Sequence, residues 1–298
     1  MVLPIDQDAF NDIIARVPEI VGAHEIHVRH LEGGLTNTNY LVEANGGQFV
    51  ARIIGDNGPV LVRDRSTEEA AMRRAEAAGV APEVVLFTQP EGHMVTRYLA
   101  DTSPLTVEAF TSTEMIPRLA GRLRDVHALD PIKGTFNPYT DIRRWLEIIG
   151  VRGTPWPDRL GVLLERVERI ERERTPVREV DFVLCHNDPY HLNFLDNGTT
   201  LWMIDWEYAG MGDRMYDLAS IGYVLDQDGR DLLVESYFSG RNPRRRDGLD
   251  AMICVVVCWN VVWSLIQTHG GVAGFDYFEF AESLFDLLPT PENGVASG

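Results

Sequence analysis

Hydrophobic spacing changes abruptly near residue 100, and no other property of the chain limits its fold as strongly. Before that point, short apolar runs separated by turn residues predict a small antiparallel sheet. Its strands are expected at residues 25–31, 39–43, 48–54, 84–87 and 93–99. After that point, apolar residues recur mostly at helical spacing. The change predicts an α+β fold with an N-terminal sheet lobe and a mainly helical C-terminal lobe.

Local signals add detail to the N-terminal lobe. Asn45 and Gly46 lie between two of the expected strands and predict a hairpin. A helix is expected at residues 6–17, and an Ala- and Glu-rich segment predicts the main helix of the lobe at residues 65–78. Gly79 directly follows that segment and is typical of a helix end.

The remaining chain is expected to form helices around one small β element. The helices are expected at residues 114–127, 141–149, 159–174, 215–225, 230–238, 249–268 and 277–287. The β element is expected at residues 182–185, 194–196 and 201–204. The sequence therefore predicts lobes of residues 1–100 and 101–288, followed by a flexible tail of residues 289–298.

Charge and cysteine content exclude several classes of protein. The 298 residues include 27 Lys and Arg against 45 Asp and Glu, a formal net charge of −18. Because nucleic-acid binding needs clustered positive charge, we expect no nucleic-acid partner, and a small cationic partner suits the chain better. Three cysteines are a sparse, odd number that argues against a disulfide framework and indicates a reducing compartment.

The sequence carries no pattern typical of a signal peptide or a membrane anchor. Its first ten residues include acidic side chains where a signal peptide needs basic ones. The longest apolar run, at residues 251–266, contains Asn260 and falls short of the roughly 20 residues that a membrane span needs. We expect a cytoplasmic protein without a membrane partner.

The stretch from Cys185 to Asn193 carries the clearest indication of chemistry. His186, Asp188 and Asn193 fit the pattern His-x-Asp-x-x-x-x-Asn, and a predicted hairpin returns Asp205 to the same place. Phosphoryl transfer needs one carboxylate facing the attacking hydroxyl, and a second carboxylate with a neutral oxygen to hold Mg²⁺ on the nucleotide phosphates. This spacing is that of a kinase catalytic loop and its metal-binding aspartate. His186 is interpreted as an orienting residue rather than a base.

The nucleotide side of such a site is expected in the first lobe. Gly33 and Gly34 join two strands, and they would let the backbone approach a phosphate closely. Arg52, on the third strand, has the position of the strand lysine that grips phosphates in protein kinases. Glu68 or Glu69 on the following helix could pair with Arg52, and the sequence leaves both open.

These motifs together resemble the aminoglycoside phosphotransferase and choline kinase superfamily, and within it the choline/ethanolamine kinase family. The matching stretches are Gly33-Gly34-Leu35-Thr36-Asn37, Val50-Ala51-Arg52-Ile53, Ala78-Gly79-Val80-Ala81-Pro82, Cys185-His186-Asn187-Asp188, Ile204-Asp205-Trp206-Glu207-Tyr208, Tyr216-Asp217-Leu218-Ala219 and Trp263-Ser264-Leu265-Ile266-Gln267. They extend over nearly the whole chain. An arginine at position 52 favours the choline kinase branch.

The resemblance implies a protein-kinase-like fold, ATP as co-substrate, Mg²⁺ as cofactor, and transfer of the γ-phosphate to a small alcohol. Asp188 matches the catalytic base, Asn193 and Asp205 match metal ligands, and Glu207 matches an acid near the metal site. Asp217 matches an acid that braces the catalytic loop. The expected nucleotide-binding residues of the N-terminal lobe are Gly33, Gly34, Thr36, Asn37, Arg52 and Glu68.

The acceptor pocket implied by the resemblance uses aromatic faces and carboxylates, which hold a quaternary ammonium. Trp263 matches a choline-contacting tryptophan of the family, and Trp259, Tyr208 and Glu207 complete the expected acceptor set. The second family tryptophan falls on Asn260, one place from Trp259. This departure leaves ethanolamine, or another alcohol, open beside choline.

Two other functions also stay open at this point. The excess acidity motivates an alternative in which the acceptor is an aminoglycoside or another polar antibiotic. The displaced Trp259 is compatible with a catalytically silent member that binds nucleotide or a cationic ligand. Either a monomer or a homodimer is expected.

Overall fold

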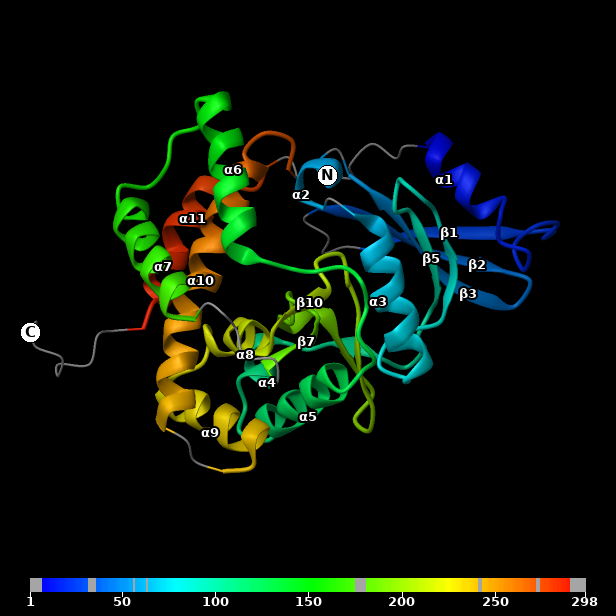
Figure 1. Ribbon diagram of the computed structural model, residues 1–298. Coiled ribbons are helices and arrows are strands. Elements are labelled where there is room, and N and C mark those ends of the chain that lie inside the picture. Colours follow the sequence, from blue (N-terminus) through cyan, green and yellow to red (C-terminus); the bar gives the residue numbers. More distant parts are fainter. Residues whose placement is uncertain are drawn as a thin grey trace, which may run out of the picture.

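The computed structural model describes residues 7–31, 36–55, 57–62, 64–174, 181–240, 243–271 and 274–289. These residues form two lobes that lie side by side, with a sheet in the first lobe and mainly helices in the second (Figure 1). The α+β two-lobe architecture expected from the sequence is confirmed. Of the expected tail, all but Pro289 lies outside the described residues.

An antiparallel sheet forms the N-terminal lobe, as expected. Its strands, in sheet order, are β1 (Ile26–Leu31), β2 (Asn37–Ala44), β3 (Gly47–Ile54), β5 (Met94–Arg97) and β4 (Val84–Phe87). The β2–β3 hairpin turns at Asn45 and Gly46, whose φ angles are 51° and 78°. An Asn-Gly pair adopts these left-handed angles readily, so the turn fixes the register of the two strands.

Two helices pack against this sheet. Phe10 of α1 (Gln7–Ile14) is buried in a small core with residues of the sheet. Met72 of α3 (Arg65–Ala77) is buried in the larger core that continues into the second lobe. As Figure 1 shows, α3 lies between the sheet and the C-terminal lobe, so its side chains can reach residues of both.

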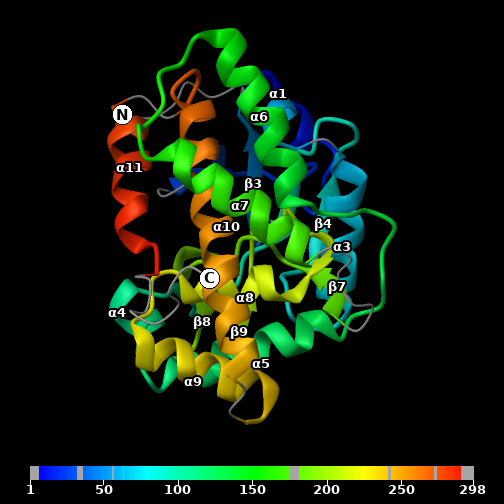
Figure 2. The same cartoon turned by 60° about the vertical axis from the view of Figure 1, so that its left-hand side comes forward.

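Most helices of the C-terminal lobe pack around α10 (Pro243–Gln267), which runs through the middle of the lobe (Figure 2). Those that contact it are α6 (Pro138–Arg152), α7 (Leu160–Arg174), α8 (Arg214–Gly222), α9 (Gln227–Phe238) and α11 (Tyr277–Leu284). In the same lobe, α5 (Met115–His127) packs against α9, and α4 (Val107–Phe110) contacts α5. Each helix expected in this lobe is present with somewhat shifted ends. The expected start of α10 at residue 249 is wrong, because the charged residues 244–247 conceal its first turn.

Among the described residues, α10 is the one helix that is long and apolar enough to span a membrane. It has 25 residues, so the expectation that this segment is too short to span does not hold for the helix as a whole. However, 83% of its apolar stretch is buried inside the protein. Its hydrophobicity is therefore that of a helix in the protein core.

Short strands hold the loops of the C-terminal lobe. The predicted β element is present as β7 (Phe182–Cys185), β8 (Phe194–Asp196) and β9 (Leu201–Met203). The sequence analysis missed β6 (Ser103–Pro104), β10 (Gly210–Asp213), α4 and the one-turn helix α2 (Gly58–Leu61). These elements are too short to show a period, and β10 contains two glycines, which have low strand propensity. β10 pairs with β7, and β8 pairs with both β6 and β9.

Candidate active site

The loop between β7 and β8 holds the first part of the site. Asn193 ends a single 3-10 turn, and its side-chain amide donates hydrogen bonds to the Asp188 backbone oxygen and to Asp188 Oδ2, both at 2.9 Å. Asn187, which precedes Asp188, has a φ of 67°. A left-handed angle outside glycine is unfavourable and is retained where the surroundings impose it. The loop is therefore a fixed conformation that sets the direction of the Asp188 carboxylate.

The His186 side chain fixes the position of this loop. It is completely buried, and its Nε2 donates to the Ile204 backbone oxygen (3.0 Å) while Nδ1 accepts from the Asp188 backbone N–H (3.3 Å). Burial lowers the pKa of His186 to about 4, so the ring is neutral at physiological pH. Both ring nitrogens are occupied by the backbone. This arrangement fits the predicted orienting role and leaves no nitrogen for a base.

Asp217 of α8 holds the same loop through its two carboxylate oxygens. Oδ2 accepts from the His186 backbone N–H (2.9 Å) and Oδ1 from the Asn187 backbone N–H (2.6 Å). His127 of α5 also contacts Oδ2 through Nε2 (2.9 Å). Asp217 has no exposed surface, so these hydrogen bonds are shielded from water. The contacts are those expected of an acid that braces the catalytic loop.

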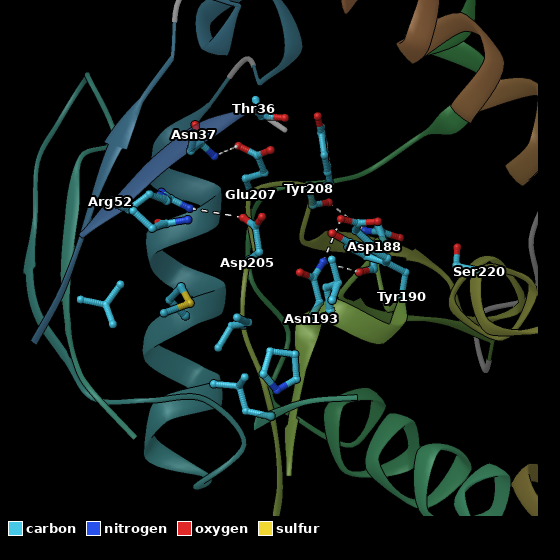
Figure 3. Close-up of a pocket in the computed structure, with 18 of the residues that line it drawn as sticks. Thr36, Asn37, Arg52, Asp188, Tyr190, Asn193, Asp205, Glu207, Tyr208 and Ser220 are labelled. Carbon is cyan, nitrogen blue, oxygen red and sulfur yellow. Dashed lines mark hydrogen bonds and ion pairs between the residues drawn. The ribbon is translucent and has the colours of Figure 1, made fainter. Parts of the chain in front are cut away.

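The connection between β9 and β10 brings two further carboxylates to the loop. Asp205 has a φ of 62°, and its Oδ1 lies 3.5 Å from Nη1 of Arg52, which comes from β3 of the other lobe. Asp205 Oδ1 is buried and has no hydrogen-bond partner among the described residues. Glu207 accepts a hydrogen bond from the side chain of Asn37 (3.1 Å). Acceptor oxygens of the C-terminal lobe thus meet donor groups of the N-terminal lobe at one junction (Figure 3).

A cavity of about 450 Å³ between the lobes collects these side chains. Its lining includes most of the expected site residues: Thr36, Asn37, Arg52, Asp188, Asn193, Asp205, Glu207, Tyr208, Trp259 and Trp263. Glu68 does not line it but lies behind Arg52. Gly33 and Gly34 lie outside the described residues. In Figure 3, Arg52 stands on one side of Asp205, and Asp188 and Asn193 stand on the other. The roles assigned to these residues stay predictions.

The clustered carboxylates raise each other's pKa values. Burial raises the pKa of Asp188 well above its ordinary range, and the charges of Asp205 and Glu207 raise it further. Burial and Glu207 likewise raise the pKa of Asp205 to about 7, against the opposing effect of Arg52. A bound cation would relieve this repulsion. Together with the Asp205 oxygen that accepts no hydrogen bond from the described residues, the electrostatics suit a hard divalent ion held by carboxylate and amide oxygens.

Four buried charges connect the two lobes behind the cavity. Arg52 forms an ion pair with Glu68, and Glu68 also pairs with Arg65 (2.7 Å), whose Nη1 reaches Glu207 (3.4 Å). All four side chains are nearly inaccessible to solvent. Between the two residues that the sequence left open, the partner of Arg52 is Glu68, whereas Glu69 accepts from an exposed glutamine. The sequence analysis missed Arg65, which is the first residue of α3, where a positive charge is unfavourable by itself.

This geometry predicts opposite outcomes for two adjacent substitutions. Glu68→Gln leaves Arg52 and Arg65 buried without their shared anion, and we expect it to lower the free energy of unfolding by about 3–5 kcal/mol. Glu69→Gln, which changes a partly exposed side chain outside this buried cluster, is the matched control and should stay within about 0.5 kcal/mol of the parent. Urea denaturation followed by circular dichroism compares them. Equal effects of the two substitutions would contradict the pairing.

Aromatic side chains form the wall of the cavity beyond Asp188. Trp263 donates from Nε1 to the Tyr208 hydroxyl (3.2 Å), and Trp259 packs edge-on against Tyr208 with ring centres 4.9 Å apart. Sequence reasoning missed Tyr190, Tyr216, Tyr223 and Ser220, which also line the cavity. Tyr190 could have been found from its position inside the catalytic loop. Tyr216 could have been found from the matching stretch Tyr216-Asp217-Leu218-Ala219, whereas Ser220 and Tyr223 carry no comparable sequence signal.

The tyrosines of this wall remain neutral and lie in a negative potential. Burial raises the pKa values of Tyr190, Tyr216 and Tyr223, and the charge of Asp188 raises each of them further. For Tyr223 the pKa rises to about 12. Since Asp188 acts on all three phenols, its charge reaches across this end of the cavity. Aromatic faces and a carboxylate together favour a cationic ligand.

Comparisons with known proteins agree with this geometry. The model of the phosphotransferase enzyme family matches residues 27–252. Protein LicA of Haemophilus influenzae is 25% identical over 274 residues, which cover 86% of this chain and 78% of LicA. Thiamine kinase of Escherichia coli is 27% identical over 210 residues, which cover 70% of each protein. A choline/ethanolamine kinase family protein from Mesorhizobium loti is similar in structure, with a TM-score of 0.79, 26% identity and 96% of both chains covered.

These similarities confirm the family resemblance and the kinase-like fold expected from the motifs. The family model extends over both lobes and includes every catalytic-loop residue discussed above. The chain therefore belongs to the phosphotransferase enzyme family.

Proposed function

We propose that this enzyme transfers the γ-phosphate of ATP to the hydroxyl of a small amino alcohol, with choline and ethanolamine as the leading acceptors. The observation that carries the proposal is the single cavity in which Asp188, Asn193 and Asp205 meet, opposite Arg52. The names of two relatives, which refer to choline, ethanolamine and thiamine, support it. Each of these compounds is a cation that carries a hydroxyl group.

The nucleotide end of the cavity is the part that the N-terminal lobe lines. Arg52 Nε and Nη1 are buried without a hydrogen-bond partner among the described residues, and both can donate to phosphate oxygens. Thr36 and Asn37 line the same end. Bound Mg²⁺ would neutralise charge on the phosphates, and Asn193, Asp205 and Glu207 are the residues that would hold it.

Asp188 has the central task in the proposed reaction. Its carboxylate, fixed by Asn193, orients the acceptor hydroxyl and accepts its proton as the new oxygen–phosphorus bond forms and ADP leaves. The aromatic wall around Tyr208 and Trp263 holds the cationic end of the acceptor, which places its hydroxyl toward the phosphate.

An ATP-coupled screen tests this function. Choline, ethanolamine, its N-methylated forms, thiamine, homoserine and aminoglycosides are the acceptors to compare, with 3,3-dimethylbutan-1-ol as an uncharged analogue of choline. We expect multiple turnover with an amino alcohol and little with the uncharged analogue. Turnover of aminoglycosides alone would replace the proposed acceptor class. Absence of turnover with every acceptor would favour a silent ligand-binding member.

Asn260 should influence how many methyl groups the preferred amine carries. Its amide nitrogen donates to the Val256 backbone oxygen (3.0 Å), which leaves the side-chain oxygen as an acceptor at the cavity. A hydrogen bond to this oxygen is worth about 1 kcal/mol, or roughly fivefold. We therefore expect N,N-dimethylethanolamine, which keeps one N–H, to have a kcat/KM about fivefold above that of choline. In Asn260→Leu, the ratio of kcat/KM for N,N-dimethylethanolamine to that for choline should fall to about one. An unchanged ratio would exclude this role of Asn260.

A further inference from the structure

The two lobes are also joined outside the catalytic residues, at the one-turn helix α2. Asn57, its N-cap, donates from Nδ2 to Oε1 of Gln267 at 2.7 Å, and the two residues are 210 positions apart in the sequence. Asn57 is 6% exposed and Gln267 is 1% exposed. A buried amide pair of this kind forms only when α2 lies against the end of α10. The hydrogen bond therefore requires one defined arrangement of the two lobes.

A second set of contacts holds α2 from the side of α6. Arg144 donates to the backbone oxygens of Val60 (2.6 Å) and Leu61 (3.2 Å), and Trp145 donates from Nε1 to Val60 (3.4 Å). These side chains donate to backbone oxygens that have no hydrogen-bond partner within a one-turn helix. Figure 1 shows α2 at the junction, facing α6. The helix is therefore held by α6 and α10 although it belongs to the N-terminal lobe.

The same segment is tied to the nucleotide end of the cavity. Gly55, between β3 and α2, packs so closely on Thr36 that a Cβ at position 55 would overlap the Thr36 carbonyl oxygen. Gln267 also reaches Thr36 directly, from Nε2 to Oγ1 at 3.5 Å. Thr36 lines the cavity at the end where β2 begins. A shift of α2 would thus move Thr36 with it.

The opposite end of this chain of contacts is the acceptor wall. Trp145 packs against Trp259 with ring centres 4.9 Å apart, and Trp259 contacts Tyr208 at the same separation. On α10, Trp263 lies four residues before Gln267, so the two share one face of the helix. Residues that line the acceptor pocket and residues that hold Thr36 therefore belong to one packed unit.

We infer that Gln267 is a positioning residue that holds the nucleotide-binding end of the N-terminal lobe against the acceptor wall, so that ATP and the amine each strengthen binding of the other. This inference rests on the proposed function. A ligand between the lobes favours the arrangement in which the Asn57–Gln267 pair forms, and that arrangement completes the site for the second ligand. The coupling is reciprocal, and a typical coupling changes affinity by about 5–150-fold.

Isothermal titration of the full chain measures this coupling directly. The Mg²⁺ complex of the non-hydrolysable analogue AMP-PNP is titrated with and without saturating ethanolamine or choline. We expect at least a fivefold gain in affinity in the parent protein, and a gain below twofold in Gln267→Leu. Asn57→Ala, which removes the same hydrogen bond from the other lobe, should give the same loss, and the double variant should lose no more than either single one.

Thr268→Ala is the matched control for these variants. Thr268 is exposed and directly follows the last residue of α10. Among the described residues its hydroxyl donates only to the Leu265 backbone oxygen (2.7 Å), so Thr268→Ala should keep the full coupling. A merely structural role of Gln267 would lower the melting temperature and leave the coupling factor unchanged, and this result would overturn the inference. Asn57→Ala decides the matter if Gln267→Leu does not fold.

The outcomes also separate this inference from the proposed function. If an amino alcohol is phosphorylated but does not change the affinity for AMP-PNP, the proposed function stands and only the coupling is refuted. If no amino alcohol is phosphorylated or bound, both are refuted. Coupling that persists unchanged in both single variants refutes the role of Gln267 alone.

Discussion

Asp188→Asn is expected to abolish nearly all turnover while the fold remains intact. Loss of a general base lowers the rate by about 10²–10⁴-fold, which is roughly 3–5 kcal/mol of barrier. Asparagine has the size of aspartate and can still accept the hydrogen bond from Asn193, so the loop geometry should persist. The fall should be in kcat, with the KM for ATP little changed, because in the proposed reaction Asp188 acts on the acceptor hydroxyl rather than on the nucleotide. Steady-state kinetics with the best acceptor of the screen give both constants.

The stability of this variant provides an independent check. The pKa of Asp188 is raised in the folded protein, so its ionised form is disfavoured there relative to the unfolded chain. Its contribution to stability is present below the unfolded pKa of about 3.9 and is lost as the pH rises through the raised value. At neutral pH, without nucleotide or metal, Asp188→Asn should therefore melt at the same temperature as the parent or higher. Full activity of the variant would refute Asp188 as the base.

Asp217→Asn is expected to damage both activity and stability. An amide can offer one acceptor oxygen where the carboxylate offers two, so either the His186 or the Asn187 backbone N–H loses its buried partner. Each unsatisfied group costs about 1–3 kcal/mol. The released loop misplaces Asp188, and a displacement of about 1 Å can reduce the rate roughly 10²-fold. Thermal melting and kcat measured on the same preparation test both effects.

Comparison of the two aspartate variants separates the proposed role of Asp188 in the reaction from the role of Asp217 in holding the loop. Asp188→Asn should lose rate without losing stability, whereas Asp217→Asn should lose both. Tyr216→Phe, beside Asp217 on α8, is a useful companion because it alters a cavity-lining phenol without touching the backbone contacts. A stable and active Asp217→Asn variant would show that the loop holds its shape without this carboxylate.

The sequence was sufficient to predict the main elements because their signals are local and periodic. The strands of the first sheet and the longer helices each bury one apolar face, and Asn45 with Gly46 specifies its own turn. The proximity of Asp188 and Asn193 was predictable for a different reason: their spacing matches a pattern that places both side chains on one short loop. The position of Asp205 was predictable because the short β8–β9 hairpin limits where the chain can return.

What the sequence did not reveal depends on distant contacts. Glu68 and Glu69 are the same residue type at adjacent positions, and only the orientation of α3 determines which one faces Arg52. The partnership of Asn57 with Gln267 has no local signal at all. Tyr223 and Ser220 reach the cavity because α8 packs beside α10, and helix packing of this kind is not encoded in a short motif.

The central position of α10 limits how this enzyme could acquire a different substrate. Trp259 and Trp263 face the cavity from a stretch of α10 in which nearly every residue is buried, so replacing either one disturbs the packing around it. Asn260 is partly exposed between them, and Phe280 on α11 is similarly accessible. Evolutionary or laboratory changes of acceptor should therefore accumulate first at these two positions, where a new side chain meets open space.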